Sequence, residues 1–402
     1  MSLNFNIQDA KSHAEQMAVR NLLCEAFEVR PGVGRAFAQL YDQVLTTPAH
    51  SRIAVCEGRV IGHALLALRT FGLGGVSLQG GIVAMVVVDN AFRSQGVGRA
   101  LVGDLEVLAR QKDILMLHVA GDPRFYTQYG FIPAYVEANA HMAIPDLPCS
   151  DALRLATRDD VSLLSRLSLS DRAFGTVVAD DRRWQWLLQT QHPKTMLQCN
   201  DLLLGIVAEQ DACLLLDDVG FVRVCWAGDR LVVYEAGCVN EAGADRLLQA
   251  CLAWGYQAGC KHLVAFLPPR NRLLITLSQY GAEIDIHEDH ELQAKVLDMP
   301  QVLVQMSDLF NRRMLGHNLR GRLGLSVGNR QVEITVGDNV EIQEVDVIGN
   351  VDWHLALSEG AFVRVLLGVD QLCDPESDLV LDAFLVRLFP KRGSFFWLSD
   401  SL

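Results

Sequence analysis

The sequence lacks any apolar run long enough to cross a membrane, and its first residues carry no signal-peptide core. The longest apolar run, about Gly80 to Val88, has only the length of a strand. We therefore expect no membrane partner, and a cytoplasmic location follows by default.

Positive charge is also scarce, because 35 Lys and Arg residues stand against 48 Asp and Glu residues, for a net charge of −13. This balance argues against nucleic acid as a partner, since phosphate backbones are bound by a basic face. The negative field is compatible with a cationic substrate such as an amine, and equally with a simple gain in solubility.

Paired cysteines are missing too, because none of the ten cysteines forms a C-x-x-C motif. Many lie in apolar runs, which predicts reduced thiols in a buried core. The stretch His287–Glu291 has its histidines three residues apart and not at H-E-x-x-H spacing. We interpret it as a solvated acidic stretch where a strand gives way to a loop, and we predict no metal site.

Half of the residues are apolar, and the chain of 402 residues is too long for one ordinary core. Residues 1–148 alternate strand-length apolar runs with amphipathic helices, which is typical of an α/β fold. Residues 149–299 repeat this order faintly, and "QYGF" at 128–131 is echoed by "QYGA" at 279–282, so we predict a degenerate duplication. Residues 300–402 change to helix, short strands and helix, which predicts a separate α+β domain.

Local patterns place the elements of these regions. The predicted strands of the first region are 52–56, 60–69, 80–88 and 114–120, and its predicted helices are 10–27, a long helix from Val97, and a short one from Pro123 to Gly130. Helices are also expected at about 301–315 and 379–388.

The stretch "RSQGVGRALV", Arg93 to Val102, stands where an apolar strand is expected to give way to a helix. A helix N-terminus offers unpaired N–H groups and a partial positive charge. Gly96 and Gly98 let the backbone come close to an anion, and Arg93 and Arg99 add full charge. This context predicts a phosphate-binding loop.

The loop resembles the acetyl-CoA loop of GNAT N-acetyltransferases, R/Q-x-x-G-x-G/A, at Arg93, Gly96 and Gly98. The proline that usually lies three residues before that arginine is Asn90 here. A second GNAT signature, an aromatic pair followed by x-x-x-G-F, is matched over residues 125–131.

The domain order resembles that of the Eis (enhanced intracellular survival) acetyltransferases. That resemblance implies two tandem GNAT-like domains, a catalytic one at 1–148 and a degenerate one at 149–299, and then a sterol-carrier-like α+β domain at 300–402. It also implies a homo-hexamer. Glu241 and Asp245 of the second repeat lie where a phosphate loop would be basic, so this repeat is expected to bind no coenzyme.

The resemblance implies that the loop backbone holds the pyrophosphate of coenzyme A and that the pantetheine arm pairs like a strand with Val86 to Val88. One N–H there would face the thioester oxygen. The residues so implied in coenzyme binding are Val86, Val87, Val88, Arg93, Ser94, Gln95, Gly96, Val97, Gly98, Arg99, Gly121 and Asp122.

Acetyl transfer to an amine needs a proton for the departing thiolate, and Tyr126 occupies the acid position of the family. Tyr129 is expected to be a packing residue. In Eis-type enzymes the base is the C-terminal carboxylate, here that of Leu402, although the family usually ends in phenylalanine. The apolar run 395–398 favours a buried approach of this carboxylate, against the usual fraying of termini.

Three further carboxylates, Glu25, Glu28 and Asp400, are candidates for binding the amine. The function implied is direct transfer of acetyl from acetyl-CoA to amines, such as aminoglycoside-like polyamines or lysine side chains, in a ternary complex. Three alternatives stay open: an N-acetyltransferase for one particular protein or peptide, a longer-chain acyl-CoA transferase, and a non-enzymatic lipid-binding protein acting through the third domain.

Overall fold

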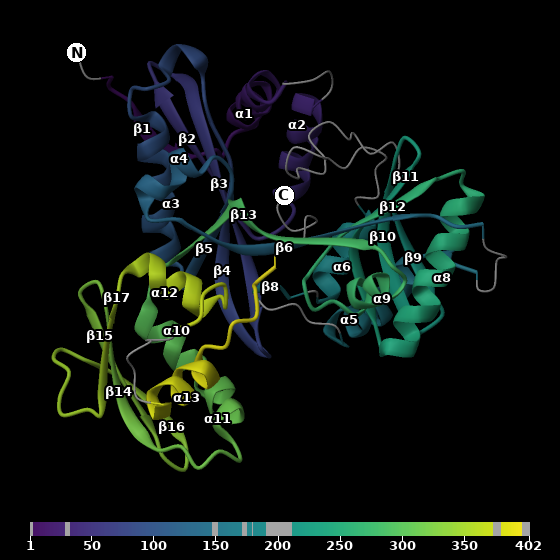
Figure 1. The fold of residues 1–402 in the computed structure, drawn as a ribbon. Helices are drawn as coiled ribbons and strands as arrows, with labels where there is room; N and C mark the ends of the chain where they lie inside the picture. The colour runs from purple at the N-terminus through teal and green to yellow at the C-terminus, as the bar shows by residue number, and fades with distance from the viewer. Residues whose placement is uncertain are drawn as a thin grey trace.

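The computed structural model describes residues 3–28, 33–146, 152–170, 175–178, 180–189, 211–372 and 379–395. Two sheets organise these residues: one of thirteen strands that runs through most of the molecule, and one of four strands near the C-terminal end (Figure 1). The fold is mixed α/β, with two tandem units on the large sheet and an additional unit around the small one.

The first unit contains most of the predicted elements. Its bounds are β1 (Asn6–Asp9), α1 (His13–Ala26), α2 (Val33–Val44), β2 (Ala49–Cys56), β3 (Arg59–Leu73), β4 (Val76–Val88), η1 (Asn90–Phe92), α3 (Val97–Gln111), β5 (Met116–Ala120), α4 (Pro123–Tyr126), η2 (Thr127–Tyr129) and β6 (Ile132–Ala143). Local chemistry explains several ends: Ser12 and Glu15 form a capping box at α1, and Asp122 caps α4. Gly130 ends η2 in the left-handed conformation.

The second unit continues the same sheet. Its elements are β7 (Arg154–Leu155), η3 (Arg158–Asp160), α5 (Val161–Ser170), β8 (Thr176–Val177), α6 (Asp181–Gln189), β9 (Asp211–Leu216), β10 (Gly220–Ala227), β11 (Arg230–Cys238), α8 (Glu241–Gln257), β12 (His262–Leu267), α9 (Arg272–Gln279) and β13 (Glu283–Val296). Its last strand does not stay beside β12: β13 lies between β5 and β6 of the first unit, antiparallel to both.

This strand order corrects one prediction. The acidic stretch 287–291, expected at a strand-to-loop transition, lies inside β13: residues 287–289 pair with β6, and 290 and 291 lie at an irregularity of the register. The sheet also crosses the predicted boundary at 148/149, because β6 pairs with β12 on one side and β13 on the other. The division into 1–148, 149–299 and 300–402 stays a proposal.

The third unit comprises α10 (Met299–Gln305), α11 (Ser307–Met314), β14 (Gly321–Val327), β15 (Arg330–Val336), β16 (Val340–Val345), β17 (Trp353–Leu357), α12 (Glu359–Leu366) and α13 (Leu379–Leu388). The single helix predicted at about 301–315 is therefore two helices that meet at Met306. The sheet has the order β16-β15-β14-β17, in which β14 and β17 are parallel.

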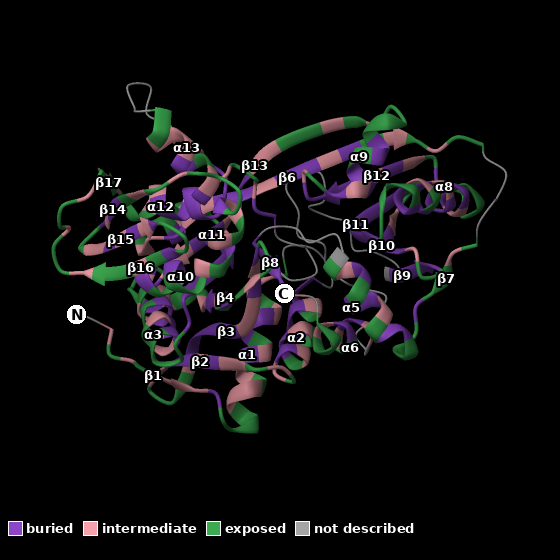
Figure 2. Cartoon of the chain, turned by 90° about the horizontal axis from the view of Figure 1, so that it is seen from below, coloured by how far each residue is buried: buried purple, intermediate pink, exposed green. Residues whose placement is uncertain are grey.

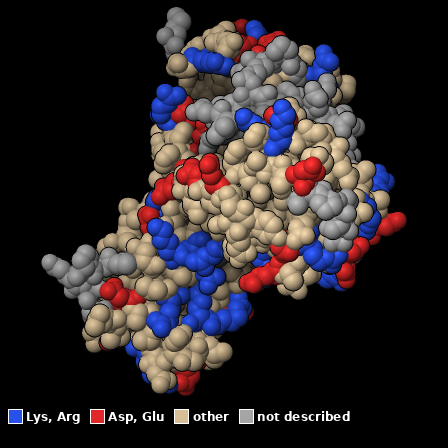
Figure 3. Space-filling model, turned by 45° about the vertical axis from the view of Figure 1, so that its right-hand side comes forward, with Lys and Arg blue, Asp and Glu red and all other residues tan. Residues whose placement is uncertain are grey.

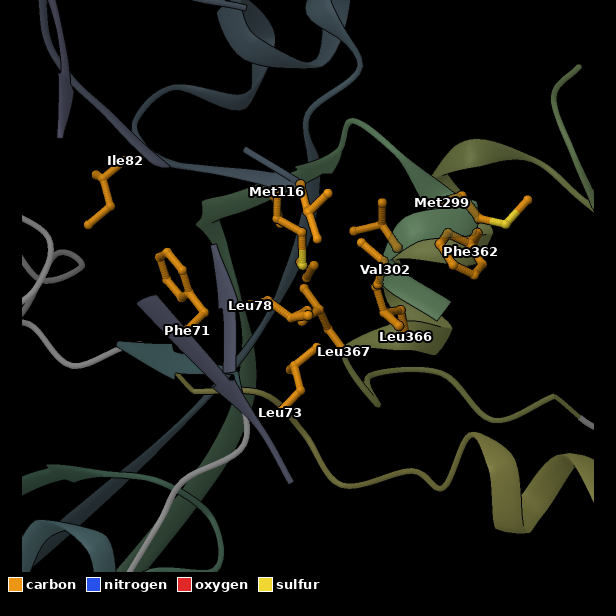
Figure 4. Packing of buried hydrophobic residues seen from close by; sticks show 14 of the residues in the cluster. Phe71, Leu73, Leu78, Ile82, Met116, Met299, Val302, Phe362, Leu366 and Leu367 are labelled. Atoms are coloured by element: carbon orange, nitrogen blue, oxygen red, sulfur yellow. The ribbon is translucent and has the colours of Figure 1, made fainter. Parts of the chain in front are cut away.

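One apolar core joins the third unit to the first. Figure 4 shows Val302 of α10 and Leu366 of α12 on the side of the third unit, approaching Leu78 and Met116 of the large sheet. Figure 2 shows buried residues along the strands and on the inward faces of the helices. The third unit is thus packed against the same sheet that carries the candidate site.

Charge is unevenly spread over the surface. On the face seen in Figure 3, Lys and Arg side chains gather in the lower part of the molecule, although the net charge is −13. Among the residues that the structure describes, no helix is long and apolar enough to cross a membrane.

Candidate active site

The candidate site lies where two neighbouring strands separate. The parallel strands β4 and β5 are paired from Gly80 and Met116 to Val83 and Val119, and β4 then runs on to Val88. Beyond the paired part is a cavity of about 850 Å³, lined from both strands. Its size suits a ligand of cofactor dimensions.

A β-bulge shapes the β4 wall of this cavity. The register between β3 and β4 shifts between His63 and Leu65, and Met85 has a φ of 51°, in the left-handed region. A bulge turns the following peptide groups out of the regular ladder, so the backbone at Val86 is re-aimed relative to the preceding strand.

The glycine loop forms one end of the cavity. Gly96 is the N-cap of α3 with a φ of 87°, and no side chain caps this helix. A Cβ at Gly98 would lie 3.3 Å from Phe125 Cζ, so this glycine allows close packing against α4. The Arg93 Nε donates to the Val88 carbonyl at 3.2 Å, which holds one guanidinium beside the helix N-terminus. The arrangement suits an anion.

The structure brings together nearly all of the residues expected to bind the coenzyme. Those that line the cavity are Val86, Val87, Val88, Arg93, Ser94, Gly96, Val97, Gly98, Arg99, Gly121 and Asp122. Gln95 is exposed and is not among the lining residues; its side-chain amide donates to the Ala91 carbonyl at 3.1 Å. The coenzyme-binding roles themselves stay predictions.

Tyr126 also lines the cavity and is 8% exposed. Burial raises the pKa of its hydroxyl, and the nearby Tyr129 adds to this rise. A Cβ at Gly121 would come within 2.6 Å of the Tyr126 ring, so the glycine makes room for it. The hydroxyl therefore stays protonated over the whole neutral range. Tyr129 also lines the cavity, and its ring contacts Phe125 at a centroid distance of 5.2 Å.

Two carboxylates that the sequence did not single out enter the cavity from β13. Asp289, which is 8% exposed, and Glu291 both line it. The Asp289 Oδ1 accepts from the backbone N–H groups of Glu291 at 2.8 Å and Leu292 at 3.2 Å. Their spacing of two residues in a strand, which places side chains on one face, was the available signal, but the acidic run was interpreted as solvated.

The other candidate carboxylates are placed differently. Ala26 and Phe27 line the cavity, whereas Glu25 and Glu28 are exposed and are not among its lining residues. The Glu28 Oε2 accepts from the Gly34 N–H at 2.8 Å, at the start of α2. Asp400 and Leu402 lie outside the described residues.

The corresponding place in the second unit is closed by its own side chains. Beyond the paired part of β11 and β12, the Asn271 Nδ2 donates to the Ala236 carbonyl at 3.1 Å, and the Arg272 Nη1 donates to the Cys238 carbonyl at 3.2 Å. The Asn240 side chain caps α8, and Glu241 lies in its first turn. These backbone acceptors and this helix N-terminus have partners within the protein. That this repeat binds no coenzyme stays a prediction.

The described part of the chain contains neither a metal-binding group of side chains nor a disulfide. Within it, no three His, Cys, Asp or Glu side chains form a group that could hold a metal ion. None of the seven cysteines that the structure describes is assigned to a disulfide, and five of them are buried, as the apolar surroundings predicted. Burial raises the pKa of the Cys251 thiol to about 12.

Residues 17–131 match the model of the acetyltransferase (GNAT) family. Three solved structures resemble the whole chain in fold. A GCN5-related N-acetyltransferase from Kribbella flavida has a TM-score of 0.72 at 16% identity, covering 99% of this chain and 98% of its own. Another from Anabaena variabilis scores 0.70 at 14% identity, and Eis1 from Mycobacterium abscessus scores 0.66 at 14% identity; each match covers 98% of this chain and 99% of the other. No curated protein sequence matches the chain.

Proposed function

We propose, from the premise that residues 17–131 form a GNAT acetyltransferase domain, that this protein transfers the acetyl group of acetyl-CoA directly to an amine. Enzymes of this family use acetyl-CoA and act on amines. One observation carries the proposal: a single cavity joins the uncapped N-terminus of α3 to Tyr126 and to the carboxylates of β13.

The residues of the glycine loop fit a pyrophosphate. The unpaired N–H groups at the start of α3 and the guanidinium groups of Arg93 and Arg99 provide hydrogen bonds and charge of the required sign. The backbone of Val86 to Val88 lines the cavity next to them, and an extended pantetheine arm would pair with it as an added strand does. The bound coenzyme would supply an activated acetyl thioester.

Tyr126 is the proton donor in this proposal. The amine nitrogen forms a bond to the acetyl carbon as the carbon–sulfur bond breaks, and the Tyr126 hydroxyl gives its proton to the departing sulfur. Burial keeps that hydroxyl protonated at neutral pH, so it holds a proton when the sulfur needs one. The step requires no acyl-cysteine.

The charge at the acceptor end favours a cationic amine. Asp289 and Glu291 bring two carboxylates to the cavity, and the whole chain adds a net charge of −13. Aminoglycoside-like polyamines and lysine side chains both carry the required charge. The charged side chains of this lining, Arg93, Arg99, Asp289 and Glu291, give no support to a plain lipid as the ligand of this cavity.

The amine must also lose a proton, and we keep the carboxylate of Leu402 as the proposed base. The last described residues run beside the sheet, because the Val136 N–H donates to the Ser394 carbonyl at 2.8 Å and Phe395 is buried. Val136 pairs with Glu288, the neighbour of the cavity residue Asp289. The seven residues after Phe395 could span up to about 25 Å if extended, and we propose that they bring the Leu402 carboxylate to the cavity. A cytoplasmic location, a hexamer, a sterol-carrier-like third domain and the absence of a metal requirement complete this proposal.

The test is a panel of acceptors with acetyl-CoA, read as release of free thiol. We expect release with polyamines or lysine peptides, and none with neutral hydroxyl acceptors. A second panel replaces acetyl-CoA by butyryl-CoA, octanoyl-CoA and palmitoyl-CoA. A preference for octanoyl-CoA or palmitoyl-CoA over acetyl-CoA would show that the protein transfers a longer acyl group and not acetyl. Thiol release with none of the amines, together with binding of a fluorescent fatty acid, would refute the enzyme and favour the lipid carrier.

A further inference from the structure

A chain of buried polar side chains leads to the bulge of β4. The His63 Nδ1 lies 2.9 Å from the Met85 carbonyl oxygen, and its Nε2 lies 3.1 Å from the Ser51 Oγ. The Ser51 Oγ in turn lies 2.9 Å from the Tyr41 hydroxyl. His63 is fully buried and Ser51 is 8% exposed. The mechanism proposed above uses none of these three side chains.

The donors and acceptors along this row of three side chains can be assigned in only one way. A carbonyl oxygen only accepts, so the His63 Nδ1 must carry the proton and donate to Met85. Burial lowers the pKa of His63 to about 4, so the ring is neutral at pH 7 and its Nε2 is an acceptor. The Ser51 hydroxyl therefore donates to Nε2 and accepts from Tyr41. The Met85 carbonyl thus sets the imidazole tautomer, and the Ser51 hydroxyl supports it by donating to Nε2.

The bulge needs such support. Met85 has a φ of 51°, in the left-handed region, which is unfavourable for a residue with a Cβ. Ala84 and Met85 both face the core beneath α1 and α2, whereas Val83 and Val86 face the core beneath α3, so the alternation of side chains slips by one residue here. The bond from His63 to the Met85 carbonyl stabilises this conformation against the regular strand.

The same bond fixes the direction of a backbone donor. The structure holds no cis peptide among its described residues, and in a trans peptide the C=O and N–H groups point in opposite directions. The Met85 carbonyl points to the His63 imidazole, so the Val86 N–H of the same peptide points away from it. Val86 lines the cavity.

We propose that His63 is a positioning residue that holds the Met85–Val86 peptide so that the Val86 N–H donates to the thioester carbonyl oxygen. This inference rests on the proposed function and deepens it. It assigns the donor to one N–H of the 86–88 stretch and its alignment to a side chain on the neighbouring strand. Charge develops on that oxygen during transfer, so a donor already in place lowers the barrier without strengthening ground-state binding much.

Substitution of His63 provides the test. His63→Leu removes the donor to Met85, and His63→Asn keeps one, because the amide Nδ2 takes the place of Nδ1. We expect turnover to fall about 10²-fold in His63→Leu, as for the loss of one oxyanion donor, with coenzyme A affinity changed less than about threefold. His63→Asn should recover most of the loss.

Infrared difference spectra with acetyl-CoA labelled with carbon-13 at its carbonyl give a readout besides activity. A hydrogen bond from Val86 moves the carbonyl stretch of the bound thioester to lower frequency. That shift should be present in wild type and His63→Asn, and absent in His63→Leu. A fold defect alone would not remove the shift while leaving coenzyme A binding intact.

Ser51→Ala serves if His63→Leu fails to fold. Without the serine hydroxyl, Nε2 loses its donor and the ring is held less firmly against the Met85 carbonyl, so the shift should weaken and turnover should fall about tenfold. Ser165→Ala is the matched control, because Ser165 is also 8% exposed and donates to Asp181 at 2.5 Å. A folded His63→Leu or Ser51→Ala with full turnover and an unchanged shift would overturn this inference alone. A wild-type protein without acetyl transfer would instead overturn the proposed function.

Discussion

At the scale of single residues, the site depends on a tyrosine whose proton is retained by burial. Tyr126 is 8% exposed, and burial raises the pKa of its hydroxyl above the ordinary value of 10. Its titration therefore lies above neutral pH, and any change of rate between pH 6 and 9 must come from another group, such as the base or the amine.

Tyr126→Phe keeps the ring and removes only the hydroxyl. Turnover should fall about 10²–10⁴-fold, because the departing sulfur loses its acid, while coenzyme affinity and thermal stability change little. Thiol release and calorimetry measure the two effects. Tyr129→Phe is the matched control, because this neighbour also lines the cavity. Equal losses in the two variants would count against the assignment.

At the scale of elements, the start of α3 is the part of the site most dependent on backbone conformation. Gly96 has a φ of 87°, and a Cβ built there would meet no protein atom within 4 Å. Gly96 lines the cavity, so we expect a side chain there to cost local strain and to obstruct the coenzyme.

Gly96→Val should therefore abolish coenzyme binding in calorimetry and lower the free energy of unfolding by about 1–2 kcal/mol. Gly103→Val is the control, because Gly103 lies in the same helix, has open space around its Cβ and lacks a positive φ. Undiminished affinity in Gly96→Val would refute the pyrophosphate site. If calorimetry showed two coenzyme sites per wild-type chain, the prediction that the second unit binds no coenzyme would be wrong.

Local patterns predicted the elements that local chemistry stabilises. The strands at the centre of the first unit, α3 and the capped helix at Pro123 all lie close to their predicted positions. Strand β6 was missed because its alanines and polar residues are weak strand formers, and it owes its conformation to β12 and β13 on either side. Helix α2 was overlooked, although its buried residues recur at helical spacing.

The residues of the candidate site also divide into those that local sequence patterns reveal and those that only distant strand pairing brings to the cavity. The glycine loop and Tyr126 belong to contiguous signatures, so the sequence could reveal them. Asp289 and Glu291 reach the cavity only because β13 pairs with β5, more than 160 residues earlier in the chain. His63 meets Met85 only across a bulged strand pair. Pairings of this kind leave no mark in a local window.

At the scale of the whole molecule, an ion-pair network joins the third unit to the large sheet. Arg364 of α12 contacts Glu288 of β13 at 2.9 Å and Asp370 at 2.6 Å, and its Nη1 donates to the Pro133 carbonyl of β6 at 3.0 Å. The guanidinium lowers the pKa values of both carboxyl groups below their ordinary values of 4.5 and 3.8.

Arg364→Met should lower the free energy of unfolding at pH 7 by about 1–3 kcal/mol, toward the lower end because Glu288 and Asp370 remain 39% and 45% exposed. A lowered carboxyl pKa means that the unfolded chain binds more protons in acid. The network's stabilisation is thus complete above about pH 5 and is lost as pH falls through the folded pKa values.

Denaturant titrations between pH 3 and pH 7 should show a smaller acid-side loss of stability in Arg364→Met than in wild type. Arg320→Met provides the comparison, because the Arg320–Asp338 pair is 70% and 87% exposed and should contribute little. An identical pH dependence in wild type and Arg364→Met would show that the network does not link the units energetically.

The proposed base makes a prediction at the same scale. Adding a short peptide after Leu402 converts its carboxylate to an amide, so turnover should collapse while coenzyme affinity persists. Leu402→Phe keeps the carboxylate and should be tolerated. If the protein extended after Leu402 were still active, the base that takes the amine proton would have to be a side-chain carboxylate. Asp289 and Glu291 would be the next candidates.

The position of β13 also sets the order in which the enzyme is completed during synthesis. The ribosome makes the glycine loop and β5 early, but Leu292, which pairs with Ala120 of β5 beside the cavity, is made about 170 residues after Ala120. At about 5–20 residues per second, this gap lasts roughly 10–30 seconds. Throughout it, one edge of β5 awaits its partner and is open to the wrong strand. The glycine loop is thus synthesised long before the strand that completes the cavity. We expect the nascent chain to depend most on chaperones during this interval.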